Sequence, residues 1–395
     1  MKLERVFLMM LIEKLSLEQV EYKPFNEVCE YIRGITYNKS QEAKEENEKN
    51  WKVLRANNID LQRKVLDLRD VKEVDSSVKV KESQRLRKND ILICAGSGSK
   101  EHIGKVAFIT EDMDYTFGGF MAVIRVISEK INSRFLFHIL AGNLFSEFLA
   151  KKLNVSTINN LNSALIKNFQ IPLPPLPIQQ EIVRILDTFT NLTAELTAEL
   201  TARRKQYEYY RDELLTFGED VEYKKLGEVV SMKAGKAIKA QDIGEKNELF
   251  SIPCYGGNGL RGYVKDANCS GDKVLIGRQG ALCGNVCFVS GEFYATEHAV
   301  VVSSDNNVDM RFLFHLLLKL NLNQYKTAGA QPGLSVSKLE TVKVQIPSIE
   351  YQRRVSKVLD LFSRYIDNLE DGLPAEISAR QKQYEYYRGK LLRFS

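Results

Sequence analysis

The 395-residue chain has few cysteines, a single tryptophan and no long apolar run near its start. Six cysteines are too few for a disulfide scaffold, and this low number is typical of a protein from a reducing cytoplasm. The longest apolar run near the start, Val6 to Ile12, is far shorter than a membrane span, and we interpret it as one face of an amphipathic helix. The sequence therefore predicts a cytoplasmic protein without a membrane segment.

The chain also lacks a strong charge of either sign. Its 56 Lys and Arg against 51 Asp and Glu give a net charge of +5, which excludes a histone-like polycation. Sequence-specific nucleic-acid binding is not excluded, because it depends on local positive patches rather than on the total charge. Hydrophobic residues make up 44% of the chain, which is enough for two or three packed domains.

An internal repeat organises the sequence. Residues 196–217 read LTAELTARRKQYEYYRDELLTF and residues 373–394 read LPAEISARQKQYEYYRGKLLRF, with 15 of 22 positions identical. The repeat continues upstream, where residues 134–138 (RFLFH) recur at 311–315 and residues 20–23 (VEYK) recur at 221–224. We infer two half-units, each a globular domain followed by a long helix.

Residues 178–216 contain no Gly or Pro and carry apolar residues at steps of three and four, which predicts one helix of 39 residues, about 58 Å long at ~1.5 Å per residue. A helix of this length cannot bury its apolar stripe alone, so we expect it to pack against the second copy as a coiled coil. The expected packing residues are Ile182, Ile185, Phe189, Leu192, Leu196, Leu200, Tyr210, Leu214, Val355, Val358, Leu361 and Phe362.

The two helices differ in length. The offset between matching residues rises from 173 at Asp187 and Asp360 to 177 at Gln206 and Gln383. The first helix contains a repeated tetrad, TAEL at 193–196 and again at 197–200, and an insertion of four residues adds about 6 Å of helix. The second helix contains Gly372 and Pro374, and we expect a kink or break there.

Short β-rich runs dominate the two globular parts, and a helical segment follows in each, at 134–149 and at 311–320. The sequence predicts an α+β fold with two repeated domains and an antiparallel pair of long helices. We expect domain 1 at 1–172, the first helix at 173–217, domain 2 at 218–346 and the second helix at 347–395.

Three candidate enzyme or metal motifs lack the context or spacing that each of them requires. The run from Gly257 to Gly262 fits GxGxxG formally, but no helical pattern follows it. The segment from Gly98 to Lys105 has the wrong spacing for a P-loop. Cys283 and Cys287 have no second close pair, so we expect buried or partly buried thiols and no metal. The chain therefore looks non-catalytic.

The layout resembles the specificity (S) subunit of type I restriction-modification systems. The resemblance rests on IPLPPLPIQQEIVRILD at 171–187, the TAEL tetrads, the duplicated KQYEYYR and GDKVLIGRQG at 271–280. It implies two target-recognition domains that each read half of a bipartite double-stranded DNA site, a helical spacer whose tetrads set the gap, and docking of two methyltransferase subunits. A restriction or translocase subunit can join such an assembly. S-adenosylmethionine, ATP and Mg are then expected only in the partners, and no cofactor in this chain.

The residues that contact DNA follow less directly from the sequence. Arg suits guanine, Asn or Gln suits adenine, and Gly-rich turns let the backbone approach a duplex. In domain 2 the candidates are Tyr255, Asn258, Arg261, Tyr263, Arg278, Gln279 and Gln331. In domain 1 they are Arg33, Tyr37, Lys39, Ser97, Lys100 and His102. Each could instead shape a turn of a β-rich domain.

A second hypothesis makes the chain a coiled-coil adaptor whose two domains bind proteins. Deleting one tetrad separates the two hypotheses, because only a specificity subunit should then change its preferred half-site gap.

Overall fold

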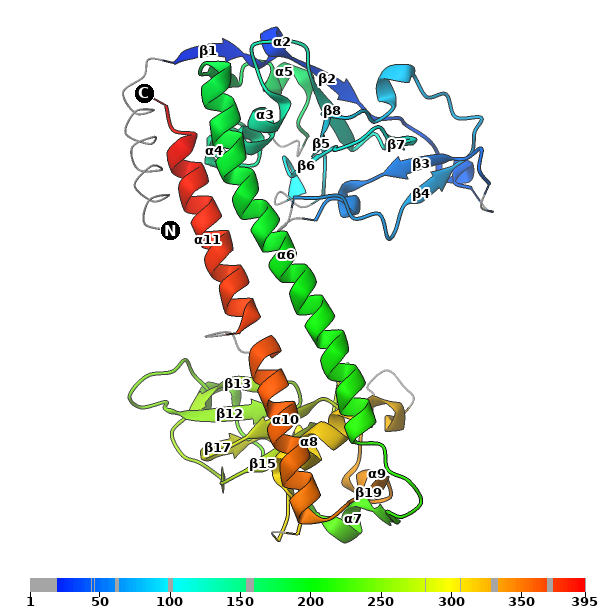
Figure 1. The fold of residues 1–395 in the computed structure, drawn as a ribbon, viewed down its shortest axis with the longest axis vertical. Coiled ribbons are helices and arrows are strands. Elements are labelled where there is room, and N and C mark those ends of the chain that lie inside the picture. The colour runs from blue at the N-terminus through cyan, green and yellow to red at the C-terminus, as the bar shows by residue number, and fades with distance from the viewer. Residues whose placement is uncertain are drawn as a thin grey trace. The chain divides into compact units, whose positions relative to one another are not determined.

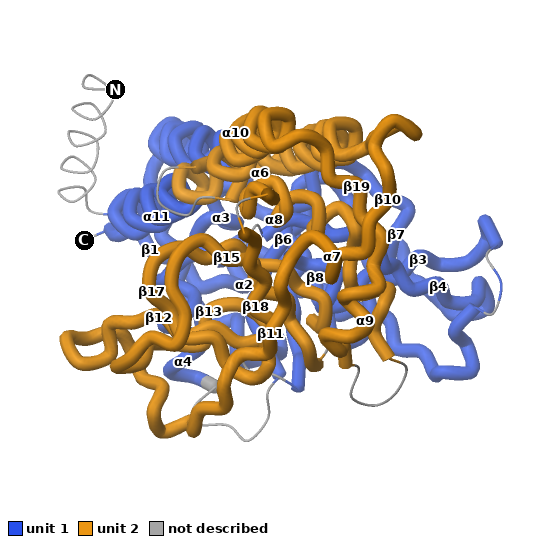
Figure 2. Tube along the Cα trace, turned by 90° about the horizontal axis from the view of Figure 1, so that it is seen from below, with its two compact units in different colours: residues 1–195, 378–395 blue, residues 196–377 orange. Residues whose placement is uncertain are grey.

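The computed structural model describes residues 20–394 except for 44, 46, 61–63, 99–101, 154–159, 281, 306, 328–332 and 368–371. The run from Val6 to Ile12 lies outside these residues. The chain divides into two compact units, with residues 1–195 and 378–395 in unit 1 and residues 196–377 in unit 2 (Figure 2). Each unit contains one globular domain together with segments of the long helices (Figure 1).

The domain of unit 1 is built on an antiparallel sheet of order β2-β8-β5-β6. Its central strands β5 and β8 are rich in buried aliphatic residues, and helices cover one face. A second sheet, of order β4-β3-β7, joins β3 and β7 in parallel. The strands are β1 (Glu21–Pro24), β2 (Cys29–Arg33), β3 (Trp51–Leu54), β4 (Lys72–Val74), β5 (Ile91–Cys94), β6 (Val106–Phe108), β7 (Tyr115–Phe117), β8 (Met121–Val126) and β9 (Gln170–Leu173).

The domain of unit 2 repeats this topology. Its antiparallel sheet has the order β11-β18-β15-β16, and in its second sheet, β13-β12-β17-β14, the strands β12 and β17 are again parallel. The repeat seen in the helices therefore extends to the sheets. The strands are β10 (Tyr223–Lys225), β11 (Ser231–Ala234), β12 (Ile252–Gly256), β13 (Gly259–Val264), β14 (Cys269–Ser270), β15 (Lys273–Gly277), β16 (Val286–Val289), β17 (Glu292–Ala295), β18 (Ala299–Ser303) and β19 (Lys343–Gln345).

Helices complete both units. In unit 1 they are α2 (Phe25–Val28), α3 (Ser133–Leu140), α4 (Asn143–Leu153) and α5 (Ser163–Ile166), and in unit 2 they are α7 (Leu226–Val229), α8 (Met310–Lys319) and α9 (Val336–Glu340). The single helix expected at 134–149 is wrong: the chain breaks between α3 and α4, where Gly142 donates its N–H to the carbonyl of Ile139.

The long helix α6 (Leu176–Leu214) has the expected 39 residues, but it begins and ends two residues earlier than the expected 178–216. It runs from unit 1 into unit 2. The expected interruption of the second helix is confirmed, because α10 (Ile349–Asp367) and α11 (Leu373–Leu391) are separate helices. Pro374 lies in the first turn of α11, where its missing N–H costs no helical hydrogen bond.

The two-helix packing is antiparallel within unit 2. Arg204 of α6 pairs with Asp367 of α10 at 3.7 Å, and Tyr210 lies against Phe362 with ring centroids 5.8 Å apart. Near the other end of α10, the Tyr351 hydroxyl donates to the carbonyl of Leu214 at 3.1 Å. Residue numbers rise along one helix as they fall along the other, as expected for an antiparallel pair.

In unit 1 the first half of α6 packs on α11. Phe189 stacks on Tyr387 with centroids 5.4 Å apart, while Ile182 and Ile185 are buried in the core of the domain. Of the other expected packing residues, Leu200 and Leu214 border the core of unit 2, Val355 is buried in it, and Leu192 and Leu196 are half-buried.

Two expected packing residues lie outside the helix pair. Val358 is 43% exposed and Leu361 is 72% exposed. The buried stripe of α10 instead follows Val355, Leu359 and Ile366, at helical spacings of four and seven residues. Val358 and Leu361 fall on the neighbouring face of the helix, so their assignment to the helix packing is wrong.

A trio of residues joins the helices to each domain. In unit 1, His138 of α3 is fully buried, with its Nε2 2.9 Å from Oδ1 of Asp187 on α6 and its Nδ1 3.1 Å from the hydroxyl of Tyr384 on α11. A neutral ring with its hydrogen on Nε2 satisfies both contacts: it donates to the carboxylate and accepts from the phenol.

Unit 2 contains the same trio. His315 of α8 is fully buried, with Nε2 2.8 Å from Oδ1 of Asp360 on α10 and Nδ1 2.8 Å from the hydroxyl of Tyr207 on α6. Tyr207 and Tyr384 occupy the same place in the duplicated KQYEYYR. Each domain is thus held by the start of its own repeat's helix and by the end of the other repeat's helix.

All six cysteines are free thiols, four of them buried and two half-buried, as expected from the sequence. In the ranges that the structure describes, no helix combines the length and the apolar character needed to cross a bilayer.

Candidate nucleic-acid interface

Four loops of domain 1 are held together by backbone pairing. Ile35, after β2, pairs with Gly118, after β7, while Gly96, after β5, pairs with Asn160. The carbonyl of Phe120 accepts from the N–H groups of Ala95 and Gly96 at 2.8 and 2.9 Å. These contacts bring loops that are distant in sequence to one end of the sheets.

Domain 2 contains the same set of backbone-paired loops, which we call the frame in both domains. Lys236 pairs with Thr296, Gln279 pairs with Gly333, and the carbonyl of His298 accepts from the N–H of Arg278 at 2.9 Å. The frame thus consists of the ends of β11, β15 and β17 together with the segment at 333. A feature present in both copies is a candidate for the function that both domains share.

Glycine is required where two of these loops cross. A Cβ on Gly34 would lie 2.2 Å from the carbonyl oxygen of Gly118, and one on Gly235 would lie 2.3 Å from that of Thr296. No side chain fits at such distances, so both copies of the frame depend on a close backbone approach.

A hollow of about 770 Å³ opens within the frame of domain 1. Three residues named from the sequence line it together: Tyr37, Lys39 and Ser97. Arg55 and Phe120 line it as well, although the sequence did not single them out. The hollow combines two cations, the carboxylate of Glu42, two aromatic rings and glycine backbone, and Arg55 also pairs with Asp70 at 3.0 Å. Cations, aromatic rings and glycine backbone are groups that proteins present to phosphates and bases.

The other three candidates of domain 1 have different surroundings. Arg33 donates to the carbonyl of Leu161 and to Oδ1 of Asn160, both at 2.9 Å, so it holds the frame together from inside. His102 is half-buried, and Lys100 lies outside the described residues.

In domain 2, Asn258 and Arg261 are exposed on the hairpin between β12 and β13. Tyr255 is half-buried and packs edge-to-face on Phe293 with centroids 6.1 Å apart, and its burial raises the pKa of the phenol. Tyr263 is also half-buried, with the ammonium of Lys246 5.7 Å from its ring centroid. The hairpin therefore combines an exposed amide and an exposed guanidinium with two half-buried tyrosines.

Arg278 and Gln279 lie within the frame itself. The guanidinium of Arg278 donates to the carbonyl of Glu297 at 3.3 Å, and Oε1 of the exposed Gln279 lies 2.8 Å from Nδ1 of His298. The remaining candidate, Gln331, falls in a segment that the structure does not describe.

Several buried polar atoms of the described residues lack partners in the two units, among them Nε of Arg388 on α11, and those of domain 2 lie at its frame. Among the described residues, no hydrogen-bond partner is present for Nε of Arg55 and Nδ1 of His102 in domain 1. The same holds in domain 2 for Nε of Arg278, Oγ1 of Thr296 and Oε2 of Glu297. Buried polar atoms are rarely left unpaired, so such a concentration marks a place built to meet polar groups of a ligand or of water.

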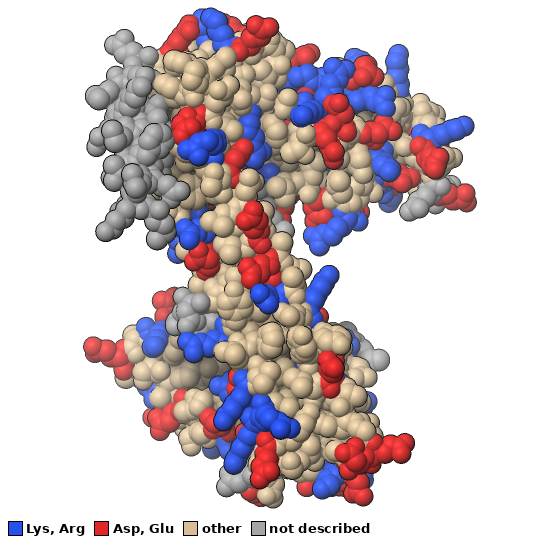
Figure 3. All heavy atoms as spheres, in the orientation of Figure 1, with Lys and Arg blue, Asp and Glu red and all other residues tan. Residues whose placement is uncertain are grey.

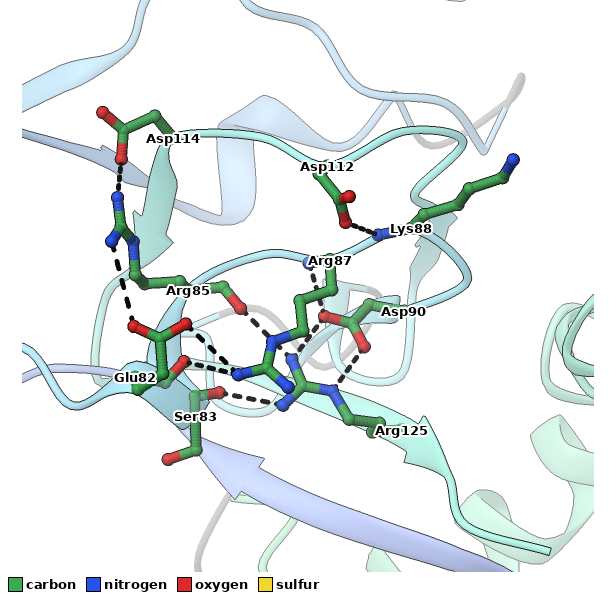
Figure 4. Close-up of polar contacts among 9 residues, drawn as sticks. All are labelled: Glu82, Ser83, Arg85, Arg87, Lys88, Asp90, Asp112, Asp114 and Arg125. Atoms are coloured by element: carbon green, nitrogen blue, oxygen red, sulfur yellow. Dashed lines mark hydrogen bonds and ion pairs between the residues drawn. The ribbon is translucent and has the colours of Figure 1, made fainter.

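A network of hydrogen bonds and ion pairs links the segments around Glu82, Asp90 and Asp114 to Arg125 in domain 1 (Figure 4). Arg125 of β8 grips Asp90 with two hydrogen bonds of 2.8 and 2.7 Å, and Asp90 is only 1% exposed. At the surface, Arg85 bridges Glu82 and Asp114. The network fixes the segment that leads into β5, whose far end carries the loop at 95–98.

Charges of both signs share the surface. Figure 3 shows Lys and Arg side chains mingled with Asp and Glu over the face that it draws, in agreement with the net charge of +5. Within the described ranges, no group of three or more His, Cys, Asp and Glu side chains could hold a metal ion. Cys283 is buried, and its thiol lies 3.3 Å from the carbonyl of Arg278.

Comparison with known families gives a double match. A family model for the type I restriction modification DNA specificity domain matches residues 18–203 and again residues 218–379. The chain belongs to this family. The two matches cover both repeated domains, so the specificity domain itself is the unit that is duplicated.

Individual relatives agree with the assignment. The specificity subunit of the type I restriction enzyme EcoprrI from Escherichia coli is 41% identical over 309 residues, which cover 74% of this chain and 76% of that subunit. A putative type I restriction enzyme specificity subunit from Haemophilus influenzae is 31% identical over 332 residues, covering 74% of this chain and 84% of the relative. The resemblance to type I specificity subunits is therefore confirmed.

A solved structure has the same fold. The S subunit of the type I restriction-modification system from M. genitalium aligns with a TM-score of 0.60 at 18% identity, over 97% of this chain and 99% of that one. The expected fold, with two repeated domains of mixed helices and sheets and a long helix between them, is confirmed.

Proposed function

We propose that this chain is the non-catalytic DNA-specificity subunit of a type I restriction-modification enzyme, and that each domain reads one half of a bipartite duplex. The observation that carries the proposal is the duplicated frame, with its cations, amides and unpartnered polar atoms, in a member of the specificity family. A domain that recognises bases needs hydrogen-bond donors and acceptors that are free in the unbound protein and pair with the base edges on binding.

The small charge excess fits a subunit that selects a site within a larger complex. Each good bidentate contact with a base discriminates by about 1–3 kcal/mol, so a few contacts per domain give specificity. Affinity for phosphates grows with the number of Lys and Arg contacts, and a chain with a net charge of +5 can make only some of these itself. The remaining contacts would come from partner subunits.

The duplicated helix ends support docking of two methyltransferase subunits. In KQYEYYR the first tyrosine contacts the buried histidine of the other repeat's domain, and the third packs on a neighbouring helix. The second tyrosine does neither: Tyr209 is 64% and Tyr386 is 56% exposed. Exposed tyrosines are frequent anchors of protein interfaces. An exposed tyrosine at the same place in both copies of the motif fits two copies of the same partner.

In this proposal the reaction chemistry belongs to the partners. S-adenosylmethionine binds the methyltransferase subunits, and ATP and Mg serve a restriction subunit where one joins the complex. This chain selects the DNA sequence and sets the spacing between the two half-sites.

Methylation mapping tests the DNA-reading role. The full chain is co-expressed with a methyltransferase subunit from the same source, and the modified positions in the host DNA are mapped. The expected result is one bipartite sequence with two defined halves and a fixed gap. Methylation without a sequence rule, together with equal binding of the purified complex to all duplexes at physiological salt, would overturn the proposal.

Native mass spectrometry tests the docking surface. Tyr209→Ala and Tyr386→Ala should each reduce the complex from two methyltransferase subunits to one, and the double variant should lose both. Tyr223→Ala is a matched control, because Tyr223 is 67% exposed on β10 outside the KQYEYYR motif. Unchanged stoichiometry in the double variant would contradict docking at this surface.

The adaptor hypothesis predicts a different outcome. Two protein-binding domains on a coiled coil would leave the methylation pattern of the host unchanged when this chain is deleted. Membership in the specificity family favours the DNA-reading role.

A further inference from the structure

Phe120 and His298 occupy the same position in the two frames. Each ends the turn that joins the parallel-paired strand to the central strand: Phe120 between β7 and β8, His298 between β17 and β18. In both turns the residue two positions earlier accepts a backbone hydrogen bond, Gly118 from Met121 at 2.7 Å and Thr296 from Ala299 at 3.0 Å.

The carbonyl of each residue is tied to the loop after the adjacent strand. That of Phe120 accepts from Ala95 and Gly96, and that of His298 accepts from Arg278. The backbone at both positions is therefore fixed by hydrogen bonds. The two side chains differ completely in chemistry, as expected of positions at which two domains read different half-sites.

The ring of Phe120 is 72% exposed at the hollow of domain 1. Exposed apolar side chains are common singly, but this one stands on a turn whose backbone is anchored, beside the cations Lys39 and Arg55. An aromatic ring on a fixed backbone, at a hollow lined by cations, a carboxylate and glycines, is suited to an apolar contact with a base. In the major groove the apolar feature is the 5-methyl group of thymine.

In domain 2 the imidazole of His298 contacts the side chains of Gln279 and Glu297. Its Nδ1 lies 2.8 Å from Oε1 of Gln279 and its Nε2 lies 3.2 Å from Oε1 of Glu297. When the hydrogen of the imidazole is on Nδ1, it donates to this oxygen, so that the amide hydrogens of Gln279 remain available to a base. Bidentate pairing with adenine needs both the oxygen and the amide hydrogens, whereas guanine offers two acceptors, N7 and O6.

The surroundings of this pair also lack partners. Within the part of the chain that the structure describes, Oγ1 of Thr296 has no hydrogen-bond partner although Thr296 is fully buried, and Nε of Arg278 and Oε2 of Glu297 are likewise unpaired. These atoms lie on the same turn and on the loop that it contacts. They give an observation independent of the equivalence between Phe120 and His298.

We propose that Phe120 and His298 are the equivalent specificity-determining positions of the two domains, Phe120 contacting a thymine methyl group and His298 orienting Gln279 to donate to guanine. Phe120 touches the base, while His298 is a positioning residue. The inference rests on the proposed DNA-reading function and adds to it the residue and the base class in each half-site.

Mapping of methylation in cells tests both assignments, with wild-type chain and variants co-expressed with the methyltransferase. Phe120→Ala should relax the preference for thymine at one position of one half-site and leave the other half unchanged. His298→Ala should release the Gln279 oxygen, so that one guanine position of the other half-site comes to accept adenine. Ile127→Ala, 60% exposed after β8, is the control and should leave the recognised sequence unchanged.

A binding experiment isolates the methyl contact. Replacing the assigned thymine by uracil removes one methyl group, which should weaken binding of the wild-type complex about fourfold and that of Phe120→Ala not at all.

The outcomes distinguish failure of the proposed function from failure of the inference alone. A wild-type chain without any sequence preference overturns the proposed function, and the inference with it. A wild-type bipartite sequence that Phe120→Ala and His298→Ala both reproduce unchanged overturns the inference alone. The inference also fails if wild-type binding is indifferent to uracil at every thymine of the half-site, or if His298→Ala loses methylation without any change of base preference.

Discussion

The hydroxyl of Tyr207 lies 2.8 Å from Nδ1 of His315, and 177 residues further along the chain Tyr384 makes the same contact with His138. Tyr207 belongs to the helix of the first repeat, yet it closes the histidine site of the second domain. The repeats therefore complete one another: unit 1 combines residues 1–195 with residues 378–395, and unit 2, residues 196–377, begins within the helix of the first repeat. This exchange makes the two trios sensitive points of the fold.

Tyr207→Phe should destabilise unit 2 by about 1–2 kcal/mol, because it removes the hydroxyl that donates to the buried Nδ1 of His315 and leaves this acceptor without a partner. Tyr384→Phe should have a similar effect on unit 1. Urea unfolding of the full chain, followed by circular dichroism, measures the change in free energy of unfolding.

Tyr209→Phe is the matched control, since the 64% exposed ring of Tyr209 stands two residues away in the same motif. Its free energy of unfolding should stay within about 0.5 kcal/mol of wild type. Equal losses from Tyr207→Phe and Tyr209→Phe would contradict a structural role for the trio.

Acid should destabilise the chain through the same histidines. Burial lowers the pKa of both His138 and His315 below the ordinary value of 6.5, and their hydrogen bonds to Asp187 and Asp360 only partly oppose this. Below about pH 6.5 the unfolded chain therefore binds protons that the folded chain does not, so stability falls as the pH drops through this window and is regained above it. Urea unfolding midpoints between pH 7.5 and 5.5 measure the slope.

His138→Gln tests the origin of that slope. A glutamine can donate its amide hydrogen to Asp187 and accept from Tyr384, yet it does not titrate. The variant should therefore show a weaker pH dependence between pH 6.5 and 5.5 than wild type. An unchanged slope in variants that replace both histidines by glutamine would assign the acid sensitivity to other groups.

Asp90→Ala should destabilise domain 1 by about 3–5 kcal/mol, because it leaves the guanidinium of Arg125, 17% exposed, without its buried partner. Asp114→Ala removes a 77% exposed carboxylate from the same network (Figure 4) and should cost at most about 1 kcal/mol. Trp51, the only tryptophan, lies in β3 of the same domain, so its fluorescence during urea unfolding reports on both variants. Similar losses for the two variants would contradict the difference in burial.

Periodicity and repetition predicted the large features of this fold. The apolar stripe predicted the length of α6, and Gly372 and Pro374 indicated the break between α10 and α11. Helical spacing alone could not choose between adjacent faces, which is why Val358 and Leu361 were assigned to the wrong one.

The interface was less readable because loops distant in sequence build it. Tyr37, Lys39 and Ser97 line the hollow as candidates chosen by residue type. Phe120 was missed because it stands between Phe117 and Met121, and an apolar residue between buried apolar residues resembles core. Its exposure follows from the turn at Gly118 and Gly119, and the equivalence with His298 appears only when the hydrogen bonds of both turns are compared.

Removing one tetrad, residues 197–200, should shorten the preferred gap between the half-sites. The deletion removes about 6 Å of α6 and slightly more than one turn, comparable to one or two base-pair steps of ~3.4 Å. Because the stripe advances by three and four residues, Leu196 can take the place of Leu200 at the border of the core of unit 2. Methylation mapping should then return the same two half-sequences with a gap shorter by one or two base pairs. A changed half-sequence with an unchanged gap would assign the spacing to the domains instead of to α6.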